Sequence, residues 1–213
     1  MSELRIPDER IVPSTLRCDA QRNLERILAA AHEVFSERGI DASMVEIARR
    51  AGVGQGTLYR RFPHRSDLLA TLIERRIREV IGWAQTACQA EDAGQALLDL
   101  MGRVIAARQT DRLLLEAIEE PGVRTERLGA LKGVFLERVG VLLARAQAAG
   151  QIREDLEPRD IPHLITAAAE SVPGAADGPP ELWRRYLAII AAGMRATGDG
   201  PLGSITVVEQ GEP

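Results

Sequence analysis

The sequence predicts an all-α fold, in which a three-helix N-terminal domain precedes a larger helical bundle, with about nine helices in total. Apolar residues recur at steps of three and four through most of the 213 residues. No segment alternates apolar and polar residues between turn signals, as a half-buried strand would. Proline and glycine fall between the apolar stripes, where they end helices. We therefore expect helices and no sheet.

Residues 1–18 mix charged residues with two prolines, and we expect them to form a flexible arm. The helical pattern begins at Asp19, which is a suitable N-cap, and Gly39 is a suitable terminator. The apolar stripe of this first helix consists of Leu24, Ile27, Leu28, Ala31, Val34 and Phe35.

A short second helix is expected directly after Ser43. Ser43 and Glu46 have the spacing of a capping box, in which the two residues satisfy each other's exposed backbone N–H groups. Gly52 can adopt the positive φ that ends a helix. The apolar members of this helix are Val45, Ile47, Ala48 and Ala51.

A turn over residues 52–55 separates this helix from another short one over 56–62, which Pro63 stops. Val53 is the one apolar residue of the turn and is placed to fill the angle between the helices. Two short helices joined by a glycine-containing turn are typical of a helix-turn-helix. We assign this domain to residues 19–65.

A long connecting helix is expected from Arg65 to about Cys88. Glu74 and Arg78 form an i,i+4 pair that we place on its solvent side. Its apolar stripe consists of Leu68, Leu69, Leu72, Ile73, Ile77, Val80 and Ile81.

The rest of the sequence predicts further helices that complete the bundle. Their expected ranges are about 93–109, 111–119, 124–149, 159–171 and 180–196. With the connecting helix they form a second domain over residues 66–196. Residues 197–213 are rich in Gly, Pro and Glu, and we expect a loose tail.

Charge is distributed unevenly along the chain. The net charge is −4, but residues 1–80 carry +2 and residues 81–213 carry −6. The segment from Ile47 to Ser66 contains five arginines and no acidic residue. Arginine is abundant throughout the chain, so the absence of acids in this segment is the more informative signal.

The sequence argues against an enzyme. The histidines His32, His64 and His163 lie in different predicted segments without metal-ligand spacing. The glycines of residues 52–56 lack the lysine and preceding strand of a phosphate loop, and no Gly-x-Ser-x-Gly motif occurs. We expect no metal or cofactor. No apolar run reaches the roughly 20 residues of a membrane span, so we expect a soluble, cytoplasmic protein.

The stretch from Gly39 to Leu69, GIDASMVEIARRAGVGQGTLYRRFPHRSDLL, resembles the DNA-binding domain of the TetR family of transcriptional regulators. The matching positions are Gly39, Ser43, Ile47-Ala48, Ala51-Gly52-Val53, Gly56-Thr57-Leu58-Tyr59, Phe62 and Arg65. Gly54 departs from the small hydroxyl residue usual there, and Arg60-Arg61 replaces an aromatic or histidine pair. The resemblance implies a dimeric regulator that binds operator DNA.

Seven residues are the candidate DNA contacts: Ser43, Gln55, Thr57, Tyr59, Arg60, Arg61 and Arg65. Leu58 and Phe62 should face the core, which leaves the other side of the 56–62 helix for base edges in the major groove. Arginine binds guanine and glutamine binds adenine in bidentate fashion, although Arg60, Arg61 and Gln55 also suit a solvated surface. The resemblance places Tyr59 against phosphate or a thymine methyl, and a core aromatic is its alternative. Ser43 is an N-cap that also suits phosphate, and Arg65 is expected to bind phosphate without reading sequence.

One such motif covers few base pairs, so we expect a homodimer on a palindromic operator. The 180–196 helix offers a pairing face of Leu182, Tyr186, Leu187, Ile190 and Met194, and the run Thr166–Ala169 allows close helix approach. The alternative is that these apolar residues belong to the core of the bundle. The rear bundle is expected to respond to a small-molecule effector, whose pocket the sequence does not locate. By family analogy the protein is a repressor. The alternative is a helical adaptor of the same fold that has lost specific DNA binding.

Overall fold

The computed structural model describes residues 14–110, 123, 125–170, 181–195 and 202, and within them the chain is all-α, as predicted. Eight helices occupy these residues, and the predicted 111–119 helix lies outside them. The helices are α1 (Ser14–Arg38), α2 (Met44–Ala51), α3 (Gln55–Arg61), α4 (Arg65–Ala87), α5 (Ala93–Thr110), α7 (Glu126–Ala148), α8 (Asp160–Glu170) and α9 (Leu182–Met194). The described residues contain no strand, only an isolated bridge between Ile152 and Arg195.

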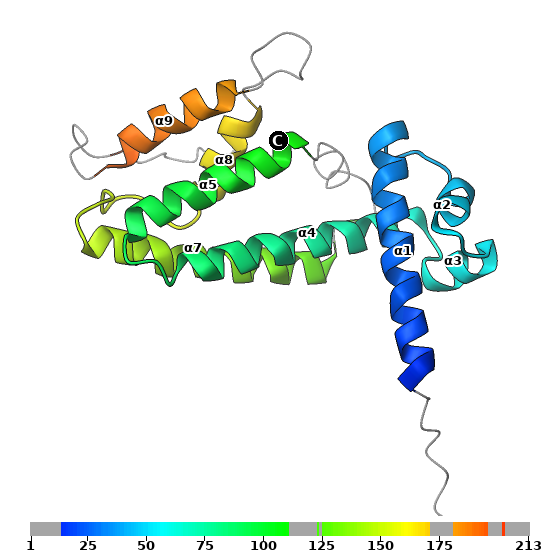
Figure 1. Ribbon diagram of the computed structural model, residues 1–213. Helices are drawn as coiled ribbons and strands as arrows, with labels where there is room; N and C mark the ends of the chain where they lie inside the picture. Colours follow the sequence, from blue (N-terminus) through cyan, green and yellow to red (C-terminus); the bar gives the residue numbers. More distant parts are fainter. Residues whose placement is uncertain (1–13, 111–122, 124, 171–180, 196–201, 203–213) are drawn as a thin grey trace, which may run out of the picture.

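Figure 1 shows two groups of helices joined by α4. Helices α1, α2 and α3 form the N-terminal domain around the start of α4. Helix α4 then runs beside α7 into the second group, which we call the body and which consists of α5, α7, α8 and α9. Within the body, α5 packs on α7 and on α8, and α9 covers α5 and α8.

The first helix begins earlier than predicted. It starts at Ser14, inside the stretch assigned to the flexible arm, so Asp19 is not its N-cap. Asp19 lies within the helix and accepts a hydrogen bond from Arg22 at 3.3 Å. Pro13 is the nearest helix breaker, and no residue between Ser14 and Asp19 interrupts the backbone hydrogen bonds. Residues 1–13 and the tail after 196, apart from Leu202, lie outside the described residues.

Helix α4 contributes to two hydrophobic cores. Its first half supplies Leu68, Leu69, Leu72 and Ile73 to the core of the N-terminal domain, where they pack with α1, α2 and α3. Its second half supplies Ala84 to the core of the body. Val123 and Leu128, which precede and begin α7, are buried in the N-terminal core as well. The two domains are therefore continuous through α4 and the start of α7.

Glu74 contradicts the prediction of a solvent-facing pair. It is only 8% exposed, and its carboxylate accepts Nη2 of Arg78 at 3.3 Å and Nε of Arg127 at 3.0 Å. Arg127 belongs to α7, which the sequence pattern of α4 does not reveal. Because α7 covers this side of α4, Glu74 joins the two helices instead of facing water. A buried carboxylate requires such partners, since an unpaired one is costly.

The predicted pairing face of α9 is only partly covered by the body. Met194 is buried in its core, whereas Tyr186, Leu187 and Ile190 are half-buried and pack against that core. Ala168 and Ala169 of the predicted close-approach run are buried in the same core. The adjacent flank of α9 carries a stripe at positions i, i+4, i+7 and i+11, in which the first two residues are half-buried and the last two are exposed, Ile189 at 59%. The stripe consists of Leu182, Tyr186, Ile189 and Gly193.

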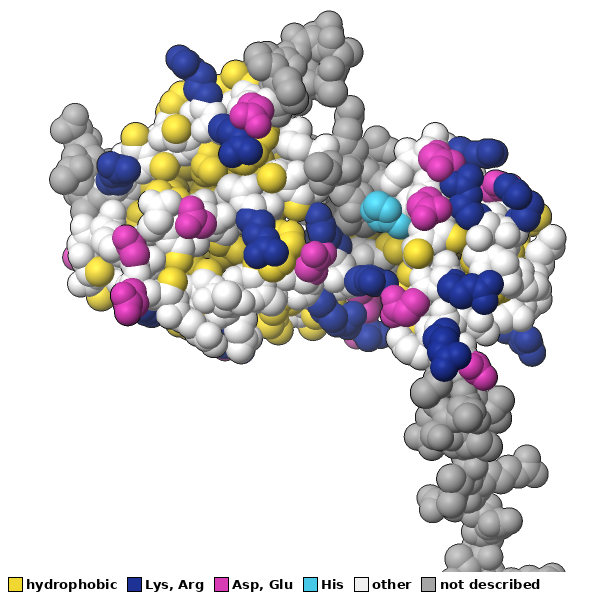
Figure 2. Space-filling model, in the orientation of Figure 1, with side chains coloured by type: hydrophobic (Ala, Val, Ile, Leu, Met, Phe, Trp, Pro, Cys, Tyr) yellow, Lys and Arg dark blue, Asp and Glu magenta, His cyan; other side chains and the backbone are white. Residues whose placement is uncertain are grey.

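Apolar and charged side chains gather over different parts of the surface. In Figure 2 the apolar side chains concentrate on the body, where α5 and α9 line a groove of about 610 Å³. Arginines and acids intermingle over the N-terminal domain in the same view. No helix in the described part of the chain is both long and apolar enough to cross a membrane.

Candidate nucleic-acid interface

The turn between α2 and α3 depends on Gly52. Its backbone is left-handed, at φ 61° and ψ 38°, and the N–H of Val53 returns to the carbonyl of Ala48 at 3.0 Å. Nη2 of Arg26 on α1 donates to the carbonyls of Ala51 at 2.6 Å and of Gly52 at 2.9 Å. Val53 packs against the core, as predicted. These contacts set the angle at which α3 leaves α2.

The start of α2 departs from the predicted capping box. Ser43 is the N-cap, but its hydroxyl accepts the N–H of Val45 at 3.2 Å. Glu46 instead accepts Nη2 of Arg49 at 2.7 Å. Met44, which the periodicity did not include, is buried in the core, whereas Val45 is 44% exposed. The helix thus presents a hydroxyl and its first N–H groups at one end of the motif.

Helix α3 has one buried side, as predicted. Leu58 is fully buried, and Phe62 at the end of the helix is buried as well. Arg60 lies on the opposite side and is exposed. Its guanidinium folds back along the helix, to the carbonyl of Gly56 at 3.2 Å and the hydroxyl of Thr57 at 3.4 Å. Gln55, at the N-terminal end of the helix, is exposed. These residues form the outward surface of α3.

Tyr59 and Arg61 lie on opposite flanks of α3, because two residues along a helix are about 200° apart. Tyr59 is 44% exposed and joins Ser43, Arg65 and Ser66 around a hollow of about 450 Å³. We call this the α2–α4 hollow. The folded chain thus brings together three predicted contacts that are far apart in sequence.

The α2–α4 hollow also contains Asp41, which sequence reasoning missed. Its carboxylate accepts Nη1 of Arg65 at 2.7 Å. Asp41 lies six residues before the acid-free segment that begins at Ile47. The charge pattern along the sequence therefore did not show that this acid is adjacent in space to Arg65. Asp41 lies in a turn in which the N–H of Ala42 donates to the carbonyl of Gly39 at 3.2 Å, so helical periodicity does not place its side chain.

Arg61 does not join this hollow. It borders a second one of about 450 Å³, the α1–α7 hollow, together with Leu24 of α1, Arg75 and Arg78 of α4, and Arg127 of α7. Arg61 is exposed there. Of the seven predicted contacts, Arg61 is therefore the one that lies on the other flank of the recognition helix.

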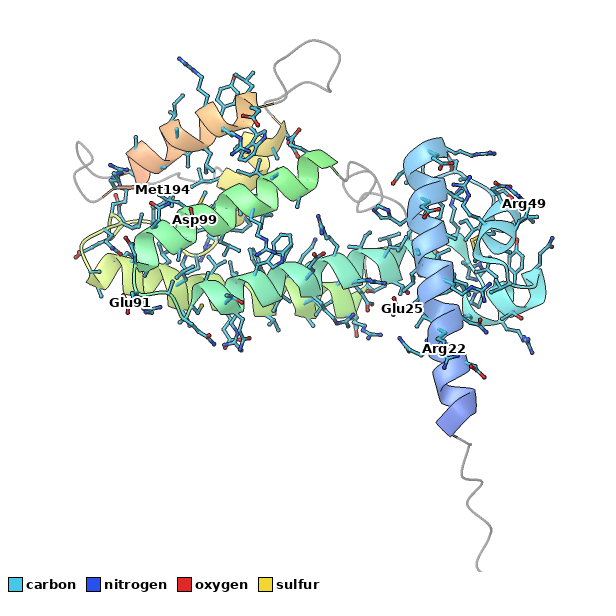
Figure 3. The ribbon with its side chains drawn as sticks, in the orientation of Figure 1. Arg22, Glu25, Arg49, Glu91, Asp99 and Met194 are labelled. Carbon is cyan, nitrogen blue, oxygen red and sulfur yellow. The ribbon has the colours of Figure 1, made fainter. Side chains whose placement is uncertain are left out.

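Arg49 and Arg50 are held by carboxylates. Arg49 is bound to Glu46, and Nη1 of Arg50 is 2.7 Å from Glu37. These hydrogen bonds lower the pKa of Glu46 and of Glu37 and raise the pKa of both guanidinium groups. Figure 3 shows Arg49 on the outer side of α2, away from the body. Their charge is thus largely compensated within the protein.

Comparison with known proteins identifies the family. Residues 27–72 match the model of bacterial regulatory proteins of the tetR family, and residues 92–196 match the C-terminal domain of SbtR-like transcriptional regulators. An uncharacterised HTH-type transcriptional regulator of Mycobacterium tuberculosis is 30% identical over 156 residues, which are 71% of this chain and 80% of the relative. The chain belongs to the TetR family. It is therefore a transcriptional regulator with a helix-turn-helix DNA-binding domain, and not an enzyme.

Solved TetR-family structures share the fold over most of this chain. A TetR protein of Mycobacterium vanbaalenii is 34% identical with a TM-score of 0.63, covering 84% of this chain and 99% of that one. SmeT of Stenotrophomonas maltophilia is 26% identical with a TM-score of 0.62, covering 87% and 100%. The predicted family and fold class are confirmed. The roles of the individual contact residues stay predictions.

Proposed function

We propose that this TetR-family regulator is a ligand-responsive repressor that binds a palindromic operator as a homodimer. The α2–α4 hollow carries the proposal, because it places Ser43, Tyr59 and Arg65 beside the outward surface of α3. A helix of this kind fits the major groove, and phosphate contacts at its edge fix its register. The protein would act on DNA in the cytoplasm.

The hollow and the helix surface have different proposed roles. Ser43, Tyr59 and Arg65 bind the DNA backbone, so they contribute affinity without reading sequence. Gln55, Thr57 and Arg60 face base edges, and Arg60 reads guanine after its guanidinium leaves the weak bonds to its own helix. Arg61 contacts the backbone at the other flank.

The stripe on α9 supports the dimer. One recognition helix reads too few base pairs for specific binding, so two copies are needed, with half-sites about 34–36 Å apart or a multiple of it. The apolar stripe of α9, with Leu182 and Tyr186 half-buried and Ile189 and Gly193 exposed, suits an isologous contact between two α9 helices. The stripe lies beside α8, which would complete a four-helix interface.

Continuity between the two domains supports the ligand response. Helix α4 is packed into both cores, and Glu74 ties it to α7 through Arg127. A ligand that favours one arrangement of the body would therefore shift the position of the recognition helices. SmeT, which shares 26% identity, is described as the repressor of a multidrug efflux pump, and repression here is proposed by analogy with it.

Selection of genomic fragments by the purified protein tests the proposal. The selection is run at about 150 mM salt, because non-specific attraction falls steeply with salt. Enrichment of one inverted repeat supports specific binding of a dimer to a palindromic operator. If a folded dimer enriches nothing, with or without added cell extract, the adaptor function is favoured instead.

Alanine substitutions separate the two proposed roles on the DNA. We expect Arg60→Ala to reduce discrimination at one base pair by about 1–3 kcal/mol, because a bidentate contact to guanine is lost. We expect Arg65→Ala to weaken operator and random duplexes by similar factors, because it binds phosphate. Binding titrations on the operator, on single-base variants and on random DNA measure both. Equal losses on every duplex from both variants would contradict this division.

A further inference from the structure

The α2–α4 hollow contains one acidic residue at the place proposed for a DNA phosphate. Asp41 is bound to Arg65 at 2.7 Å, its own side chain is 87% exposed, and that of Arg65 is 31% exposed. The other lining residues are Ala42, Ser43, Met44, Tyr59 and Ser66, which carry no formal charge at neutral pH. Asp41 therefore pairs with Arg65, the only positively charged residue among the described residues that line the hollow.

We propose that Asp41 sets the DNA affinity of this regulator by competing with a backbone phosphate for Arg65. The inference rests on the proposed function, because it takes Arg65 as a phosphate ligand. It adds a residue that opposes binding, located two residues before the N-cap of α2.

The competition follows from the strengths of the two contacts. An exposed ion pair is weak, because water and salt screen it and two side chains lose freedom. The contact between Asp41 and Arg65 joins one carboxylate oxygen to Nη1, whereas a phosphate can accept two N–H groups of the guanidinium in bidentate geometry and so displaces the carboxylate. The displaced carboxylate stays beside the same hollow, where it repels the phosphate. Because this repulsion acts on the backbone, it weakens binding to every sequence alike.

The test is Asp41→Asn in the full chain, which removes the charge and keeps the size of the side chain. We expect about tenfold tighter binding to the operator and to a random duplex, since a dimer carries the change twice. The gain should shrink as salt rises from about 50 to 300 mM, because screening weakens the repulsion. In the Arg65→Ala background the gain should fall to less than half of its logarithmic value, because no guanidinium remains to be released.

Asp99→Asn is the matched control. Asp99 is exposed on α5 in the body (Figure 3). Its substitution by Asn therefore changes the net charge by the same amount as Asp41→Asn, but away from the proposed DNA interface. We expect less than a twofold effect from it. An equal gain from the two variants would overturn the local role of Asp41 in favour of net charge.

The remaining outcomes distinguish this inference from the proposed function. If the wild-type protein binds its operator and Asp41→Asn binds equally or more weakly, the inference is wrong, and Asp41 instead holds Arg65 in its binding orientation. If the wild-type protein binds neither duplex at low salt while folded and dimeric, the proposed function fails, and the inference fails with it.

Discussion

Gly52→Ala is expected to lower the free energy of unfolding by about 2–3 kcal/mol and to abolish most operator binding. A non-glycine residue at φ 61° costs about 1–2 kcal/mol. An added Cβ would also lie 2.6 Å from Nη2 of Arg26. That guanidinium would have to move, and the carbonyls of Ala51 and Gly52 would lose hydrogen bonds from it. The angle between α2 and α3 would then change, and the recognition helix would no longer fit the groove.

The neighbouring glycine provides the control. Gly54 has φ −65°, and an added Cβ would lie 3.9 Å from the hydroxyl oxygen of Thr57, which is an ordinary contact. We expect Gly54→Ala to change stability by less than about 1 kcal/mol, because alanine adopts this conformation freely. Denaturant unfolding followed by circular dichroism, at one protein concentration, measures both variants. Equal losses from the two substitutions would show that the left-handed turn is not the cause.

Ile189→Asp is expected to convert the dimer into monomers at micromolar concentration. Ile189 is 59% exposed in the single chain, so its substitution does not disturb the core of the body. At an isologous α9 contact the change would bury two carboxylates near each other, which costs far more than the lost apolar contact. We expect the dissociation constant of the dimer to rise at least about 100-fold, corresponding to roughly 3 kcal/mol. Operator affinity should fall with it, because the two half-sites are no longer bound together.

Val141→Asp serves as the matched control for this experiment. Val141 is a similarly exposed apolar residue, at 46%, but it lies on the outer side of α7. We expect it to leave the oligomeric state unchanged. Sedimentation equilibrium on the two variants, with circular dichroism to show that both are folded, gives the comparison. If the Ile189→Asp protein remains dimeric, the α9 stripe is not the dimer interface.

Local sequence was sufficient for most of the helix-turn-helix. The N-cap Ser43, the terminator Gly52 and the buried Leu58 were predicted, and the structure confirms each position. These features depend on backbone hydrogen bonds within a few residues, so the sequence determines them nearly alone. The family resemblance was predicted from the same stretch, and the family match over residues 27–72 confirms it. The predicted start of α1 at Asp19 was wrong. Aspartate is a good N-cap residue but does not by itself end the preceding helical turn, and no helix breaker lies between Ser14 and Asp19.

Tertiary structure decided which side chains meet. Asp41 and Arg65 are 24 residues apart, and Arg26 reaches the turn from 25 and 26 residues away. Glu74 is buried because α7 covers it, although its spacing to Arg78 is that of a solvent-exposed pair. On α9 the periodic stripe was visible, but only packing against α5 and α8 showed which flank it leaves at the surface. Helical periodicity identifies apolar residues on one helix, whereas the neighbouring helices determine which of them are buried and which charges are paired.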